Sequence, residues 1–228
     1  MSIKDLTQKS FSVLIIRSLG IVLLFGFTLF ITNFFSAENV GRYDFVRSTL
    51  MVLGGVALMG TNQSIIYYSG LLEARNSAES IRNIYAKMLR IILALSLIIL
   101  GLFTVFFNKS ITSEIFKNKE SYSLILKAAL TLVFFAITML NIDTIRALKK
   151  TILSEMYRSL FRYLPVFIFA FFLLWIDNEE LLVEVYLFSF LLLSILSSIS
   201  VNRLFKKINK PNQKSEFFTT GQIFKTSY

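Results

Sequence analysis

The chain has 228 residues, of which 55% are hydrophobic and 17% charged, with a mean hydropathy of +0.66 and a net charge of +10. It contains no cysteine and no histidine, which excludes disulfides, thiol chemistry, and histidine as a base, metal ligand or proton switch. The basic residues lie mostly between apolar runs. We therefore expect the charge to set orientation and to attract anionic membrane lipids, and we expect no nucleic-acid partner.

The apolar runs predict an all-α, polytopic membrane protein. A helix needs about 20 apolar residues to cross the hydrocarbon core, and several runs are that long. We expect a bundle of six transmembrane helices over residues 1–205, followed at 206–228 by a basic tail or the lead-in to a second lobe. The spans are expected at about residues 11–35, 45–69, 88–107, 122–142, 152–175 and 181–204.

The first two spans, joined by an expected turn at 36–44, each carry an arginine. Arg17 is the only charge of the first span, and Arg47 lies near the start of the second. Insertion scales put the cost of an arginine near the bilayer centre at about 2.5–3.5 kcal/mol, so such a residue usually faces protein or a water-filled cavity. Arg17 and Arg47 therefore either face a polar cavity that attracts an anion or extend to the membrane interfaces.

Small residues in these two spans predict close helix contacts. The first span contains Gly20 and Gly26, and the second contains Gly54, Gly55 and Gly60. Small side chains let a neighbouring backbone approach in lipid, so we interpret these glycines as packing positions.

The fifth expected span is polar at its start. Ser154, Arg158 and Arg162 are spaced at i, i+4 and i+8 and form one stripe on a helix. Pro165 follows within a turn and is expected to kink the helix, which frees a carbonyl near the stripe. At the end of the fourth span, Asp143 and Arg146 are spaced at i, i+3 and can pair on one helix face.

The loop charges predict the orientation. If both termini are cytoplasmic, the segments on that side hold fourteen lysines and arginines and the opposite segments hold four. Arg17, Arg158 and Arg162 then lie in the cytoplasmic half. With only Glu155 and Asp143 nearby, they leave an excess of positive charge that suits a phosphate or pyrophosphate. The alternative is that Arg158 and Arg162 are interfacial anchors.

No enzyme signature is present in the sequence. It has no phosphate-binding loop, no glycine-rich nucleotide fingerprint and no nucleophile with a histidine base. We therefore expect no catalytic residue, no cofactor and no bound metal.

Four segments of the first hairpin resemble those of polysaccharide-biosynthesis flippases, the O-antigen or Wzx-type members of the multidrug/oligosaccharidyl-lipid/polysaccharide exporter superfamily. They are RSLG at 17–20, FSAENVGRYDF at 35–45, GG at 54–55 and GTNQSIIYY at 60–68. The resemblance is best over residues 1–90 and continues in helix count to about 205. It implies two six-helix lobes around a central cavity, with basic residues on the first two helices, here Arg17 and Arg47.

By this resemblance the chain is one lobe of a flippase of a bacterial inner membrane. The family implies transport of undecaprenyl-pyrophosphate-linked oligosaccharide, with a second lobe or another copy completing the path. We expect Arg17, Arg47, Arg158 and Arg162 to bind the anionic headgroup, the last two by inference from the stripe. The alternatives are a multidrug or ion exporter lobe, a non-transporting membrane assembly subunit, and a membrane enzyme such as a polysaccharide polymerase.

Overall fold

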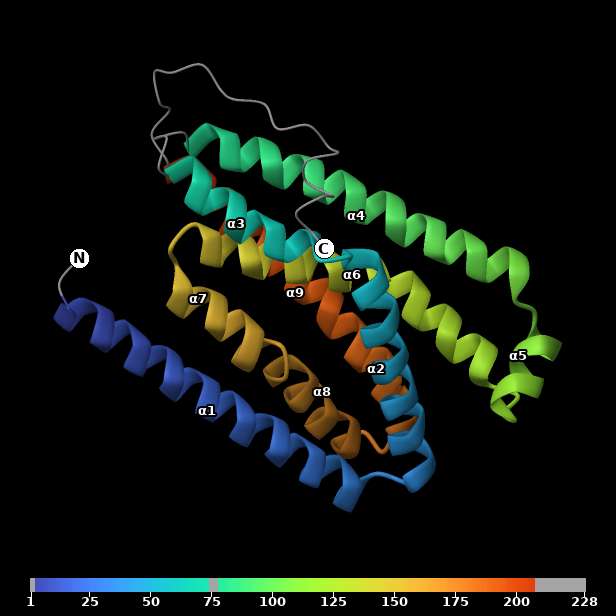
Figure 1. Cartoon of the computed structure of the whole chain (residues 1–228). Helices are drawn as coiled ribbons and strands as arrows, with labels where there is room; N and C mark the ends of the chain where they lie inside the picture. The colour runs from blue at the N-terminus through green and yellow to red at the C-terminus, as the bar shows by residue number, and fades with distance from the viewer. Residues whose placement is uncertain (1–2, 74–77, 208–228) are drawn as a thin grey trace.

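The computed structural model describes residues 3–73 and 78–207, so the tail at 208–228 lies outside the described residues (Figure 1). The described elements are all helical. They are α1 (Ile3–Phe34), α2 (Ala37–Leu58), α3 (Thr61–Glu73), α4 (Ala78–Phe106), α5 (Lys109–Phe116), α6 (Ser121–Ala147), α7 (Thr151–Glu155), a π-helix (Met156–Phe161), α8 (Leu164–Trp175), a 3-10 turn (Glu179–Leu181) and α9 (Leu182–Lys207).

Five of the described helical stretches are long and apolar enough to cross a membrane, and a sixth is counted if the bent pair α2–α3 is one span. Their outward faces are apolar: Trp175 and Val105, for example, are 78% and 77% exposed. Exposed apolar surface on this scale suits lipid rather than water. The prediction of an all-α polytopic membrane bundle is confirmed.

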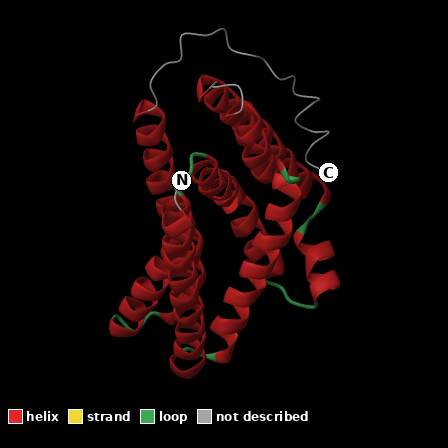
Figure 2. Cartoon of the chain, turned by 60° about the vertical axis from the view of Figure 1, so that its left-hand side comes forward, coloured by secondary structure: helices red, strands yellow, loops and turns green. Residues whose placement is uncertain are grey.

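α6 is the central helix of the bundle. It packs against α9, α2, α3 and α4, and its side chains Leu132, Ala136 and Leu140 are fully buried. α1 lies apart from this group and runs alongside α7, the π-helix and α8, as Figures 1 and 2 show. The first two helices are therefore neighbours in sequence but belong largely to different packing groups.

Two of the glycines are close-packing positions. A Cβ built on Gly20 would lie 2.5 Å from the Ser159 Cβ, and one built on Gly54 would lie 2.3 Å from the Phe135 ring. Gly26 and Gly55 have no such neighbour within 4 Å, so the packing expectation fails for them. α1 contacts the π-helix, and α2 contacts α6, because these two positions lack side chains.

The second span differs from the expected continuous helix. It begins at Ala37, where the Ser36 hydroxyl caps the first turn, so most of the expected turn at 36–44 is helical. It then bends by 44° between α2 and α3. Met59 and Gly60 at the bend have φ angles of 41° and 71°, a left-handed conformation that ends α2. The sequence signal for this bend is Gly60, because glycine adopts a left-handed conformation readily; from the sequence alone we interpret it only as a packing residue.

The fifth span is also irregular, as Pro165 predicts. Pro165 lies in the first turn of α8, where a backbone N–H would have no partner within the helix, so proline removes no hydrogen bond there. The irregular backbone is the π-helix and the turn that precede α8. A π-helix within an α-helical span commonly marks a functional site. Arg158 lies inside this π-helix and Arg162 directly follows it.

Candidate functional site

The two irregular spans meet at the carboxylate of Asp143 on α6. Asp143 is 3% exposed, accepts a hydrogen bond of 2.6 Å from the Asn62 amide and forms an ion pair with Arg158. Asn62 is the second residue of α3, directly after the bend, so the carboxylate also lies near the positive end of that helix dipole. One buried anion therefore joins the broken second span to the π-helix of the fifth.

A second ion pair holds α1 to the same layer. The Arg17 guanidinium donates to both Glu155 carboxylate oxygens, at 3.1 and 3.3 Å, and Glu155 also accepts from the Ser159 hydroxyl at 2.8 Å. Glu155 is 5% exposed, whereas the Arg17 side chain is 60% exposed. The carboxylate is thus a buried acceptor with three donated hydrogen bonds, and the guanidinium reaches it from the bundle surface.

A network of neutral polar side chains continues this layer to α4 and α9. The Tyr85 hydroxyl donates to the Asn141 side-chain oxygen at 2.7 Å, and the Asn141 amide donates to the hydroxyls of Ser197 and Ser198 at 2.9 Å. The sequence alone did not identify Tyr85 and Asn141 as partners in this network. The available signal was Asn141 itself, since a buried amide in an apolar span requires hydrogen-bond partners.

Arg162 has a different environment. It lies near the middle of the fifth span, half-buried, with its guanidinium 5.8 Å from the Phe135 ring centroid, 5.6 Å from that of Tyr163 and 5.9 Å from that of Phe190. Among the described residues, no carboxylate pairs with it. Aromatic faces attract a cation but do not neutralise it, so Arg162 retains its charge and its donors for another group.

Arg47 lies beside a buried tyrosine pair. Its guanidinium is 3.3 Å from the Asp44 carboxylate and 5.9 Å from the Tyr43 ring centroid, and Tyr43 packs edge to face on Tyr186 at 5.0 Å. Both the Arg47 Nε and the Tyr186 hydroxyl are buried without a hydrogen-bond partner in the described part of the chain. The Tyr186 hydroxyl lies within electrostatic range of both Arg162 and Arg47, which links these two arginines.

The structure therefore divides the four predicted site residues into two pairs. Arg17 and Arg158 each have a buried carboxylate partner, whereas Arg162 and Arg47 share an aromatic environment around Tyr186. The excess positive charge expected among Arg17, Arg158 and Arg162 is consequently located at Arg162. We name these two groups the paired layer (Arg17, Asn62, Asp143, Glu155 and Arg158) and the aromatic site (Tyr43, Arg47, Arg162, Tyr163 and Tyr186).

The sequence allowed Asp143 to pair with Arg146, but its partner is Arg158. The chain reverses after Ala147, and the Ser154 hydroxyl of α7 donates to the Ile142 carbonyl at 2.9 Å, which places α7 against α6. Arg158 then reaches Asp143, while Arg146 is exposed. Arg146 lies on the same helix as Asp143, but water can solvate its exposed side chain, so an ion pair between them would add little stability.

The chemistry of these groups suits anion binding. Guanidinium groups offer planar paired donors that match phosphate oxygens, and the aromatic site supplies such donors away from bulk water. Within residues 3–73 and 78–207, no cluster of three or more acidic side chains has metal-binding geometry.

The described helices make the chain a multi-pass membrane protein with two irregular spans that meet at a buried carboxylate. Its span arginines are held in two ways, by carboxylates and by aromatic rings. The chain matches no family model, and comparisons with curated proteins and with solved structures found no match.

Proposed function

We propose that the chain is a transporter lobe that binds the anionic headgroup of a lipid-pyrophosphate-linked oligosaccharide during its passage across the membrane. The observation that carries the proposal is Arg162, a mid-span guanidinium surrounded by three aromatic rings and paired with no described carboxylate. An unpaired cation within a membrane span is costly, so an anion that binds there would offset part of this cost.

Three of the four arginines suggest an order of contacts for such an anion. Arg158 and Arg162 lie one turn apart, at the paired layer and the aromatic site respectively, and Arg47 extends the line on α2. A pyrophosphate displaces Asp143 from Arg158, gains Arg162 and then reaches Arg47. The apolar tail of the substrate remains among the exposed Leu and Phe side chains that face lipid.

The irregular spans support movement at this site. Broken membrane helices in transporters place backbone groups and helix ends at the binding site, and the α2–α3 bend and the π-helix both lie at the paired layer. We propose that a second lobe or another copy of the chain supplies the opposite wall, because alternating access requires two bodies that move against each other.

The test is binding of undecaprenyl pyrophosphate to the purified full chain in detergent, measured by microscale thermophoresis. Arg162→Gln is expected to weaken binding about tenfold, the loss of one charge-assisted hydrogen bond. Arg146→Gln is the matched control, since Arg146 is exposed, and it is expected to leave binding unchanged. Equal affinities of the wild type and Arg162→Gln would contradict the proposal and favour a membrane assembly subunit.

Asp143 favours a second candidate, an ion-coupled exporter lobe. A buried carboxylate within a membrane span is the group expected in a cation exporter, and Asp143 is 3% exposed. Efflux of a lipophilic dye cation from proteoliposomes, abolished by Asp143→Asn and unaffected by Arg162→Gln, would support this candidate over the flippase lobe.

A further inference from the structure

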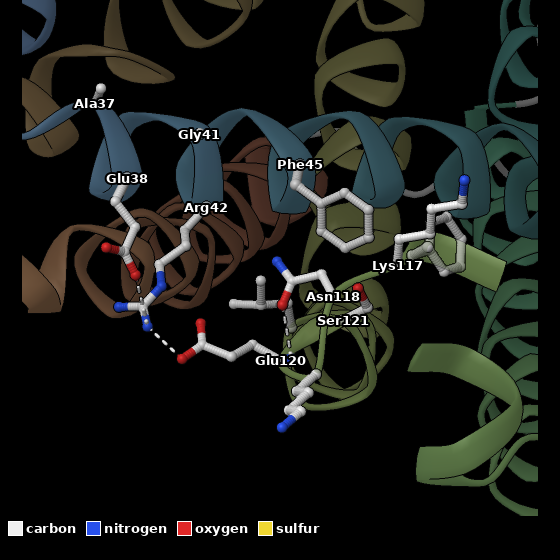
Figure 3. A pocket seen from close by; sticks show the side chains of 12 residues that line it. Ala37, Glu38, Gly41, Arg42, Phe45, Lys117, Asn118, Glu120 and Ser121 are labelled. Carbon is white, nitrogen blue, oxygen red and sulfur yellow. Dashed lines mark hydrogen bonds and ion pairs between the residues drawn. The ribbon is translucent and has the colours of Figure 1, made fainter. Parts of the chain in front are cut away.

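A pocket opens between α2 and the link from α5 to α6, at the end of the bundle opposite the paired layer (Figure 3). Its volume is about 780 Å³. The polar and aromatic side chains that line it include Glu38, Arg42, Phe45, Lys117, Lys119 and Glu120. None of them belongs to the paired layer or the aromatic site, so the pocket is separate from the proposed transport site.

The pocket contains charges of both signs. Arg42 pairs with Glu120 and lies 3.6 Å from the Glu38 carboxylate, as the dashed lines in Figure 3 show. Its Nε is buried without a hydrogen-bond partner among the described residues. The Glu38 and Glu120 side chains remain 78% and 45% exposed, so their carboxylates can accept further hydrogen bonds. The exposed Lys117 offers an ammonium that forms no ion pair with another described residue.

The pocket lies where two of the described membrane spans begin, a position expected at the depth of the lipid headgroups. α2 and α6 both begin beside it, and Asn108 caps the short helix α5 with a 2.8 Å bond to the Ile111 amide. On α5, Ile111, Ile115 and Phe116 are exposed on the side that an interfacial helix turns toward lipid. The Phe116 ring packs edge to face on Phe45 at 5.4 Å, which joins this interfacial helix to the pocket wall.

We infer that this pocket binds the headgroup of a zwitterionic phospholipid that carries a primary ammonium, of the phosphatidylethanolamine type. The lipid phosphate lies near the exposed Lys117 and Lys119, and its ammonium donates to Glu38 and Glu120. The acyl chains leave along Phe45 and Phe116. A choline headgroup has no N–H to donate to the carboxylates, and a glycerol headgroup has no positive charge to match them.

The test uses a glycine that lines the pocket. A Cβ on Gly41 meets no atom within 4 Å and Gly41 lines the pocket, so Gly41→Leu is expected to reduce the space available to a headgroup. Gly55→Leu is the matched control: Gly55 lies on the same helix, also has no neighbour within 4 Å, and is outside the pocket.

The full-length protein is purified from an equimolar mixture of phosphatidylethanolamine, phosphatidylcholine and phosphatidylglycerol, and retained lipid is counted by native mass spectrometry. The wild type and Gly55→Leu are expected to retain phosphatidylethanolamine about tenfold over phosphatidylcholine, the effect of one charge-assisted hydrogen bond. Gly41→Leu is expected to lose this preference, and Lys117→Gln to reduce it.

Three results would overturn the inference: equal retention of the two zwitterionic lipids by the wild type, preferential retention of phosphatidylglycerol, or the same lipid profile for Gly41→Leu and Gly55→Leu. The second result would mean that the lysines attract any anionic lipid. Because the readout is lipid retention and the variants lie outside both arginine groups, the outcome does not depend on whether the chain binds undecaprenyl pyrophosphate.

Discussion

The paired layer and the aromatic site both contain arginines, but they differ in whether a carboxylate neutralises the guanidinium. In the paired layer, Arg17 and Arg158 meet buried carboxylates, so their charge is neutralised and they join helices to one another. In the aromatic site, Arg162 lies over three rings without a described carboxylate partner. The comparison teaches that an arginine in a membrane span is not by itself a binding residue. Its partner decides whether it contributes mainly to stability or remains available to a ligand.

The largest effect on stability is expected from Asp143→Ala. It leaves Arg158 and Asn62 without their common acceptor, and breaking a buried ion pair costs about 3 kcal/mol. The measurement is the free energy of unfolding in mixed micelles with increasing SDS. The double variant Asp143→Ala/Arg158→Ala is expected to recover part of the loss, because no unpaired cation remains. Strictly additive losses would show that the pair does not stabilise the bundle.

A smaller loss is expected from Gly54→Leu, which tests the packing behind the aromatic site. The new side chain collides with the Phe135 ring, one of the three rings around Arg162, and overpacking of this kind costs about 2 kcal/mol. Thermal unfolding in detergent measures it. Gly55→Leu, on the open side of the same helix, serves as the control with an unchanged midpoint, and an equal drop in both variants would refute the close contact.

Arg17→Gln is expected to cost about 1 kcal/mol, since the guanidinium is largely exposed and solvent screens much of its attraction to Glu155. Glutamine still offers one amide donor to the buried carboxylate. The same SDS titration measures this change, and Arg17→Lys separates charge from the paired geometry. A loss as large as that of Asp143→Ala would mean that the two ion pairs of the paired layer are equivalent.

The smallest effect on stability, about 0.5 kcal/mol, is expected from Arg162→Gln, because only cation–π contacts are lost. The same variant is expected to have the largest effect on pyrophosphate binding. Arg162→Gln is thus expected to rank last among these variants for loss of stability and first for loss of pyrophosphate binding. This opposite ranking is the most direct test of the difference between the paired layer and the aromatic site. A large loss of stability in Arg162→Gln would place this residue with the paired layer.

The sequence predicted the class of fold well because span length and apolar content depend on local composition. It also predicted the irregular fifth span, since Pro165 acts on its own helix. It did not predict the bend after Met59, where the backbone conformation depends on how α3 packs on α6. Nor did it predict that Asp143 selects Arg158 over Arg146, because that choice requires the reversal between α6 and α7.

The placement of α1 has a consequence for biosynthesis. Glu155, the carboxylate that pairs with Arg17, lies 138 positions later in the chain. The segments that pack against α1, namely α7, the π-helix and α8, are therefore also synthesised late. During translation α1 is therefore in the bilayer without its Glu155 partner while three later spans insert. The nearly uniform apolar surface of α1 is compatible with lipid on every side at this stage. The long aliphatic stem of Arg17 lets its guanidinium extend to water until Glu155 is inserted. A ribosome stalled before residue 151 should leave α1 open to lipid-phase crosslinkers on every side.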